Sequence, residues 1–253
     1  MGRRPSPLVP AEVRIASSGG LNILRHAPFN GRMTTAQTPA SATVADTVPL
    51  DDVMSRLGRH RPVFHSEADL QHGFARTLWE LAPDVESRLE VPQREEPGRR
   101  RYLDLLCIGR TRTAIEFKYF TRGWTGTSGV PPEDYALRDH AATDLARLHF
   151  VRDLARLERF CAGREQNGLA VMVTNEASLW TPPAPGRKQT RDEEFRIHQG
   201  RTLTGTLLWA GGTYKRNTCA LLGTYDLSWK PYSELGGQGG EFRYLAVEVG
   251  PVS

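Results

Sequence analysis

The chain has 253 residues, enough for one well-packed domain or at most two small ones. Its three cysteines are odd in number and far apart, which fits neither a disulfide framework nor a zinc knuckle. No apolar run reaches the length of a membrane span and no secretory leader is recognisable, so we expect a cytoplasmic protein with no membrane partner.

The net positive charge of the chain resides entirely in its first 45 residues. This segment holds five arginines and one acid, Glu12, which together account for the whole net charge of +4. The remaining residues are neutral overall, so global charge does not itself indicate a nucleic-acid partner. Two local clusters, 94–101 ("REEPGRRR") and 186–191 ("GRKQTR"), suit contacts with phosphates, although solvated surface turns explain each of them more simply.

Residues 1–45 mix Pro, Ser, Thr, Ala and Gly without periodicity, a composition typical of a disordered tail. Met33 is a plausible second start within it. We therefore predict a single domain over residues 46–253. Its core is expected over about 63–176, followed by a β-rich extension over about 187–253.

Removing residues 1–32, so that the protein begins at Met33, is expected to leave the melting temperature unchanged, because the removed segment has no core-forming pattern. The isoelectric point should fall, because the five arginines of the tail and Glu12 are lost together. Scanning calorimetry and isoelectric focusing of both proteins check this. A large fall in the melting temperature would show instead that the segment packs on the domain.

Hydrophobic periodicity predicts a helix over 66–81, begun by Ser66 in a spacing close to a capping box with Asp69. Short apolar runs that end at turn residues follow this helix. They predict strands over 85–91, 102–108 and 113–120, the last two joined by a short turn.

A segment rich in Gly and Pro, 121–134, is expected to be an irregular loop. The longest helical pattern follows over 139–163, and 169–174 is a continuous apolar run typical of a buried strand. Further strand-like runs lie at 203–209, 218–228 and 241–249. The order helix, three strands, helix, strand predicts an α/β fold in which helices flank a central mixed sheet.

Three charged residues stand inside the apolar strands: Asp104, Glu116 and Lys118. A charge in an apolar strand is costly unless it is paired or binds a metal. Glu116 and Lys118 are two residues apart and so point to the same face, and Asp104 stands beside Glu116 if the two strands pair through their short turn. Two carboxylates this close repel each other unless positive charge lies between them.

The helix over 66–81 adds a fourth charged residue to this group. Glu67 continues, at helical spacing, the apolar stripe that faces the strands, and Gln71 lies close to the same side. With the three strand residues, Glu67 is expected to converge on one pocket. Three carboxylates and an ammonium in one pocket suit a magnesium-type ion and a phosphate.

The spacing of an aspartate, eleven residues and then Glu-x-Lys, on consecutive strands after a helix that begins with an acid, resembles the PD-(D/E)XK nuclease superfamily. The resemblance covers about residues 63–176 and implies a restriction endonuclease-like αβββαβ core. It also implies a Mg²⁺-dependent endonuclease or phosphodiesterase, for which Mn²⁺ can substitute. The expected substrate is nucleic acid, with DNA as the main one.

Residue roles follow from this resemblance position by position. Asp104 and Glu116 match the metal ligands, and Lys118 matches the lysine that activates or orients the attacking water. Glu67 matches the helix acid, which binds the metal directly or through water.

Three further residues are expected to support the site: Gln71, Arg152 and Arg156. The two arginines either contact a phosphate or pair with Asp153 as a salt-bridge set on the helix face. The same helix lacks the glutamine-tyrosine pair of the RecB-like branch, and Leu103 replaces the proline of the family name, a common and harmless change. The subfamily, and with it the substrate, stays open.

Composition gives independent support to the lysine of the motif. The chain has 29 arginines and only four lysines, so its general preference is for arginine. A lysine kept at position 118 indicates that a compact, titratable ammonium is needed there.

The sequence also leaves alternatives open. The charged strand residues fit a structural ion-pair cluster at the end of a sheet. The chain as a whole also fits a nuclease-like module that binds DNA or a protein partner without catalysis, and a metabolic α/β enzyme is a more remote option because no cofactor motif is present. The sequence leaves open the strand form and the sequence specificity of the substrate, and whether cleavage is endo or exo. It also leaves open whether the protein is a monomer or a homodimer.

Overall fold

The computed structural model describes residues 42–94, 100–162 and 166–250. Most of the predicted tail and part of the basic cluster at 94–101 lie outside these residues. The helices are α1 (Leu50–His60), α2 (Glu67–Leu81), α3 (Thr143–Cys161) and the short α4 (Ala177–Trp180). None of the helices in this described part of the chain is long and apolar enough to cross a membrane.

The central sheet has six strands in the order β11-β12-β8-β5-β4-β3. They are β3 (Glu86–Arg94), β4 (Arg100–Ile108), β5 (Arg112–Phe120), β8 (Gln166–Thr174), β11 (Trp229–Glu234) and β12 (Glu241–Val249). β5 and β8 are parallel, and every other pair in this sheet is antiparallel. Parallel strands need a crossover connection, which α3 supplies here. The predicted α/β fold with a central mixed sheet is therefore confirmed.

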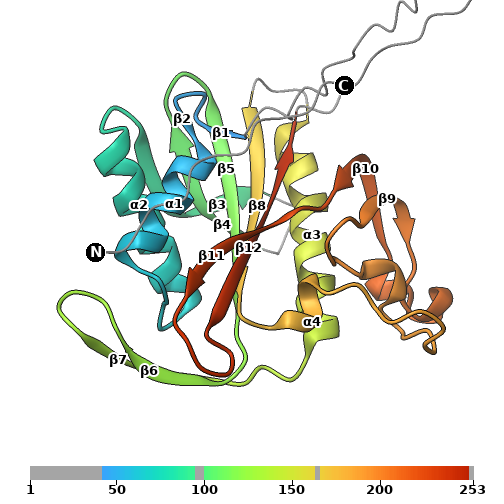
Figure 1. Cartoon of the computed structure of the whole chain (residues 1–253). Coiled ribbons are helices and arrows are strands. Elements are labelled where there is room, and N and C mark those ends of the chain that lie inside the picture. Colours follow the sequence, from blue (N-terminus) through green and yellow to red (C-terminus); the bar gives the residue numbers. More distant parts are fainter. Residues whose placement is uncertain (1–41, 95–99, 163–165, 251–253) are drawn as a thin grey trace, which may run out of the picture. The chain divides into compact units, whose positions relative to one another are not determined.

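Helices cover both faces of the sheet, as predicted (Figure 1). α1 and α2 pack on one face, where Phe74 of α2 meets Phe117 of β5 with 5.1 Å between ring centroids. α3 packs on the other face through a buried stripe that includes Leu154. Because side chains alternate along a strand, Phe117 points toward α2 while Glu116 and Lys118 point toward α3.

The first turn of α2 is fixed by side-chain capping, as the sequence predicts. Ser66 Oγ accepts a hydrogen bond from the backbone N–H of Asp69 at 3.2 Å. The Asp69 carboxylate accepts one from Arg61 at 2.7 Å. A capped helix start is worth about 1 kcal/mol and gives the residues of the first turn, Glu67 among them, a defined position.

The Gly/Pro-rich segment after β5 is not the irregular loop that we predicted. It contains β6 (Trp124–Ser128), which pairs antiparallel with β7 (Glu133–Leu137). Trp124 and Tyr135 are buried in the apolar layer that α1 and α2 form with the sheet. A Cβ at Gly126 would lie 2.6 Å from the Trp124 ring, so glycine makes room for the indole. Burial of two aromatic side chains outweighs the low strand propensity of Gly126, and Pro131 and Pro132 lie in the turn between the two strands.

The folded region begins earlier than the boundary that we predicted at residue 46. Thr43–Val44 forms β1, which pairs with β2 (Val48–Pro49), and both Val44 and Ala45 are fully buried. α1 follows directly and was not predicted. Its buried residues recur at helical spacing, which is the signal that could have identified it: Leu50, Val53, Met54 and Leu57.

The predicted β-rich extension divides between two sheets. β12 pairs with β8 and β11 pairs with β12, so both extend the central sheet. β9 (Thr202–Leu207) and β10 (Cys219–Asp226) form a separate antiparallel pair that packs with α3. The two edge strands of the central sheet each carry a proline and an irregularity: Pro92 near the unpaired Glu90 in β3, and Pro231 beside a register shift in β11.

Candidate active site

β4 and β5 separate partway along their length, and the candidate site lies in the opening. Their pairing ends at Ile115, although β5 continues beside β8 to its last residue. Beyond that point, acidic side chains replace the missing strand partner. Asp104 Oδ2 accepts the backbone N–H of Phe117 at 2.7 Å. Glu67 Oε2 accepts the backbone N–H of Tyr119 at 2.8 Å.

The pairing of β3 with β4 is interrupted at the same place. The residues on either side of Glu90 pair with those on either side of Asp104, but these two residues form no pair. Glu90 has a φ of +51°, a left-handed conformation that is uncommon for residues other than glycine. Such strained backbone clusters at functional sites. The distortion on both sides of Asp104 therefore agrees with a functional role for this residue.

Glu116 and Lys118 meet residues of α3 on the other face of the sheet. Arg156 forms a close ion pair with Glu116 Oε2 and a second one with Asp153 Oδ1 at 3.0 Å. Lys118 Nζ lies 3.0 Å from Asp153 Oδ2 and 3.8 Å from Glu67 Oε1. Asp153 thus links the two cations. Glu67, Asp104, Glu116 and Lys118 lie in one cluster, as predicted, although Lys118 pairs with Asp153 and Glu67 and not with the two strand carboxylates.

The cluster holds more acidic than basic groups. Four carboxylates (Glu67, Asp104, Glu116 and Asp153) stand against two cations (Lys118 and Arg156). Burial raises the pKa of Glu116 to about 9, against the opposing effect of Arg156 and with a further contribution from Asp104. Burial likewise raises the pKa values of Glu67 and Asp153.

Lys118 responds to the same surroundings in the opposite sense. Burial alone would lower its pKa, but Asp153, Glu67 and Asp104 outweigh burial and raise it. Lys118 is therefore a charged ammonium at neutral pH. The Asp153 carboxylate holds it in place, and the ammonium also donates to the backbone carbonyl of Phe117 at 2.6 Å.

The chemistry of the cluster fits a divalent cation. The atoms in it that could bind a metal are carboxylate oxygens, which hard cations such as Mg²⁺ prefer. Glu116 Oε1 is buried without a hydrogen-bond partner, and such a buried acceptor is costly unless something satisfies it. No three His, Cys, Asp or Glu side chains in the described ranges form a ready-made set of metal ligands, however. The cluster thus suits a divalent cation by the type of its ligand atoms and by its acidic character.

Two of the expected supporting residues lie beside the cluster and not within it. Gln71 is buried on α2, and no hydrogen bond joins it to the cluster in the described part of the chain. Arg152 donates to the backbone carbonyl of Arg216 at 2.7 Å and to Asn217 Oδ1 at 3.0 Å. Only Arg156 pairs directly with a predicted site residue.

Sequence analysis missed the role of Asp153 in the site and did not single out His149 near it. Asp153 was interpreted only as part of a salt bridge on the helix face, yet it is the acid that holds Lys118. His149 is exposed one turn earlier, and partial burial together with Arg152 and Lys118 lowers its pKa despite Asp153. The spacing of positions 149, 153 and 156 places them on one helix face and was the available signal.

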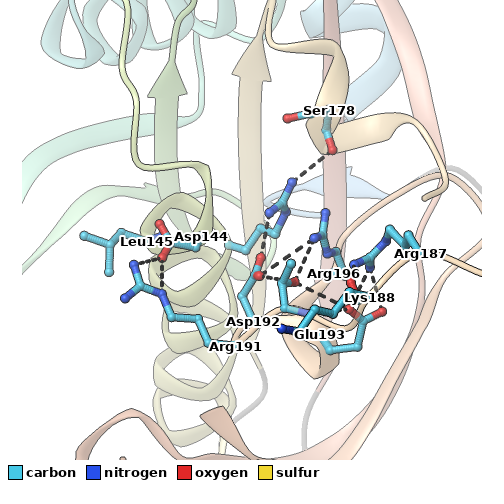
Figure 2. Close-up of polar contacts among 11 residues, drawn as sticks. Asp144, Leu145, Ser178, Arg187, Lys188, Arg191, Asp192, Glu193 and Arg196 are labelled. Atoms are coloured by element: carbon cyan, nitrogen blue, oxygen red, sulfur yellow. Dashed lines mark hydrogen bonds and ion pairs between the residues drawn. The ribbon is translucent and has the colours of Figure 1, made fainter. Parts of the chain in front are cut away.

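A second group of charged residues, at the start of α3, has a different character. Arg147 Nη1 lies 2.6 Å from Asp192 Oδ2, and both side chains are 3% exposed. Figure 2 shows two further pairs in this group, Arg191 with Asp144 and Arg187 with Glu193. Each carboxylate has its own guanidinium partner, and the contacts hold residues 187–196 against α3. We therefore assign this group to the scaffold, and its arginines at 187 and 191 are already paired with acids.

Comparison of the chain with protein-family models, with curated proteins and with solved structures gives no significant match.

Glu116→Gln is expected to change how stability depends on pH. Because folding raises the pKa of Glu116 from 4.5 to about 9, the folded protein binds this proton more tightly than the unfolded chain. The free energy of unfolding should therefore fall as pH rises through this window, by up to about 1.4 kcal/mol per pH unit. The variant lacks this dependence.

Urea unfolding of both proteins in EDTA between pH 5 and 9 measures the difference. The exposed Glu86→Gln is the control, and its stability should follow the wild type. Parallel curves for the wild type and Glu116→Gln would contradict a raised pKa for Glu116.

Proposed function

We propose that this protein is a metal-dependent nuclease of the PD-(D/E)XK type that hydrolyses phosphodiester bonds of nucleic acid, with DNA as its main substrate. The observation that carries the proposal is the convergence of Glu67, Asp104, Glu116 and Lys118 at the opening between β4 and β5. A scaffold would gain little from this arrangement, because buried charged groups seldom improve stability over apolar residues.

The order of elements supports a restriction endonuclease-like core as part of the same proposal. α2, β3, β4, β5, α3 and β8 follow one another as an αβββαβ series, and among the described residues of this stretch only the β6–β7 hairpin interrupts it. The candidate residues lie on β4, β5 and the first turn of α2, as the resemblance implies.

Each residue has a role in the proposed hydrolysis. Asp104, Glu116 and Glu67 would hold Mg²⁺, with Mn²⁺ as a substitute. The ion, when bound, polarises the phosphate and lowers the pKa of a water molecule. Lys118 would donate a hydrogen bond to the developing negative charge at the reaction centre, and Asp153 keeps its ammonium oriented.

A second candidate function is a module that binds nucleic acid or a protein without catalysis. The observation in its favour is the pairing of Arg156 with Glu116, which already compensates one of the expected metal ligands. The two functions differ in metal dependence, since only the nuclease requires the carboxylates to bind an ion.

Incubation of the purified protein with plasmid DNA, single-stranded DNA and RNA, in Mg²⁺, Mn²⁺ or EDTA, tests the proposal. We expect cleavage with either ion and none in EDTA. Asp104→Asn, purified in the same way, is the control for contaminating nuclease and should be inactive. Binding without cleavage under every condition would support the second candidate, and equal activity of Asp104→Asn would remove the cluster from the reaction.

A further inference from the structure

A short turn lies next to the candidate active site and is held there by Arg152. The 3₁₀ turn η3 (Lys215–Asn217) supplies both acceptors of the Arg152 guanidinium, the Arg216 carbonyl at 2.7 Å and Asn217 Oδ1 at 3.0 Å. Arg152 lies one helical turn before Arg156, which pairs with Glu116 of the cluster. Arg152 therefore holds η3 against α3, within one helical turn of the residue that pairs with Glu116.

The turn presents an aromatic ring and two cations to solvent. Tyr214 is 57% exposed, and Lys215 and Arg216 are exposed beside it. The stretch 209–218 ("WAGGTYKRNT") contains no acid to neutralise them. An aromatic ring next to exposed cations is the combination with which proteins bind single-stranded nucleic acid, because the ring stacks on a base while the cations contact phosphates.

The backbone in front of η3 is held in a strained conformation. Ala210 has φ 49° and ψ 47°, followed by Gly211 and Gly212 with positive φ. For a residue such as alanine this conformation is unfavourable by about 1 kcal/mol or more and persists only where the surroundings impose it. Trp209 provides that restraint, since it is buried and packs against Phe195 with 5.4 Å between ring centroids.

Hydrogen bonds within the turn complete its rigidity. Thr213 Oγ1 donates to the Ala210 carbonyl at 2.9 Å, and the N–H of Asn217 donates to the Tyr214 carbonyl at 2.9 Å. A group that is ordered before binding loses less entropy when it binds. The turn thus fixes the backbone of Tyr214, and the ring extends into solvent from a defined point.

We propose that η3 and Tyr214 form a docking point for a single strand of nucleic acid, in which Lys215 and Arg216 contact phosphates and Tyr214 stacks on a base. This inference rests on the proposed nucleic-acid substrate and adds that the substrate is single-stranded where it contacts η3. A strand docked at η3 lies against α3 within one helical turn of Arg156, so the docking point brings the strand toward the cluster.

Binding of the full chain to fluorescent DNA, measured by anisotropy in EDTA so that no strand is cut, tests the inference. Tyr214→Ala should bind single-stranded DNA about 5- to 150-fold more weakly, whereas Tyr214→Phe, which keeps the ring, stays within about twofold of the wild type. Lys215→Ala/Arg216→Ala should reduce the slope of log affinity against log salt by about 1.4. A duplex of the same length should be affected less by Tyr214→Ala, because its bases are already stacked.

The matched control is Arg59→Ala/Arg76→Ala, which removes two exposed charges from α1 and α2 on the other face of the sheet. The inference is overturned if the wild type binds and cleaves while Tyr214→Ala and the Lys215/Arg216 variant keep its affinity for single strands. That result leaves the proposed function intact. The expected losses in a wild type that binds but never cleaves support the docking point and overturn the nuclease. A wild type that binds no nucleic acid overturns both.

Discussion

Lys118→Arg is expected to keep the affinity for nucleic acid and to lower turnover by about 10²–10³-fold. The ammonium of Lys118 sits between Asp153 and Glu67 and also donates to the Phe117 carbonyl at 2.6 Å. A guanidinium is planar, larger and permanently charged, so it keeps the positive charge but cannot take the same position. Binding depends mainly on that charge, whereas stabilisation of the transition state depends on where the charge lies.

Lys118→Ala should lose turnover to at least the same extent while the carboxylates still bind the metal. Single-turnover rates with saturating enzyme, anisotropy with labelled DNA, and Mg²⁺ titration by calorimetry separate the three properties. Lys188→Arg, at an exposed position on another part of the chain, is the control. Wild-type turnover in Lys118→Arg would reduce the role of the lysine to its charge, and full turnover in Lys118→Ala would exclude it from the reaction.

Asp192→Asn is expected to destabilise the protein by about 3–5 kcal/mol, because it leaves Arg147 buried without its counter-ion. Asp104→Asn should leave the metal-free protein equally stable or more stable, since it removes one of several carboxylates that repel each other. Both aspartates accept hydrogen bonds, at 2.6 Å for Asp192 and 2.7 Å for Asp104. The difference in stability between the two variants therefore reports whether each aspartate is paired with a buried cation or lies among other carboxylates.

Urea unfolding in EDTA at pH 7 measures both variants against the wild type. Burial opposes the charge of Asp192, but hydrogen bonds from Thr190 and Arg147 outweigh it and lower the pKa of Asp192 below its ordinary value of 3.8. Its stabilisation is therefore present above that value and lost as pH falls further, so the advantage of the wild type over Asp192→Asn should shrink in strong acid. A large loss of stability in Asp104→Asn would instead support a structural ion-pair cluster at the candidate site.

The sequence predicts the strand part of the site well, because alternation along a strand is a short-range property. Glu116 and Lys118 are two residues apart and share a face whatever the rest of the fold does. The position of Asp104 needs only the pairing of consecutive strands, and that of Glu67 needs only the helical stripe. All four residues were therefore placed without long-range information.

The contribution of α3 could not be predicted in the same way. Helical spacing puts Asp153 on a face with Arg156, but it does not say which face of which strand that side meets. The separation of β4 and β5 after Ile115 was also invisible, since it depends on side chains of Asp104 and Glu67 replacing strand hydrogen bonds. The β6–β7 hairpin was missed because its glycines and prolines conceal the two aromatic residues that anchor it.

The outer strands of the central sheet are poorly suited to pair with a strand from another molecule. Edge strands expose unpaired N–H and C=O groups and are the usual route to intermolecular β-aggregation. In β3, Pro92 removes one donor, Glu90 bends the backbone, and the exposed Glu86 and Arg88 add charge. In β11, Pro231 and the adjoining register shift have the same effect. Growth of the central sheet from one molecule to the next is therefore disfavoured at both of its edges.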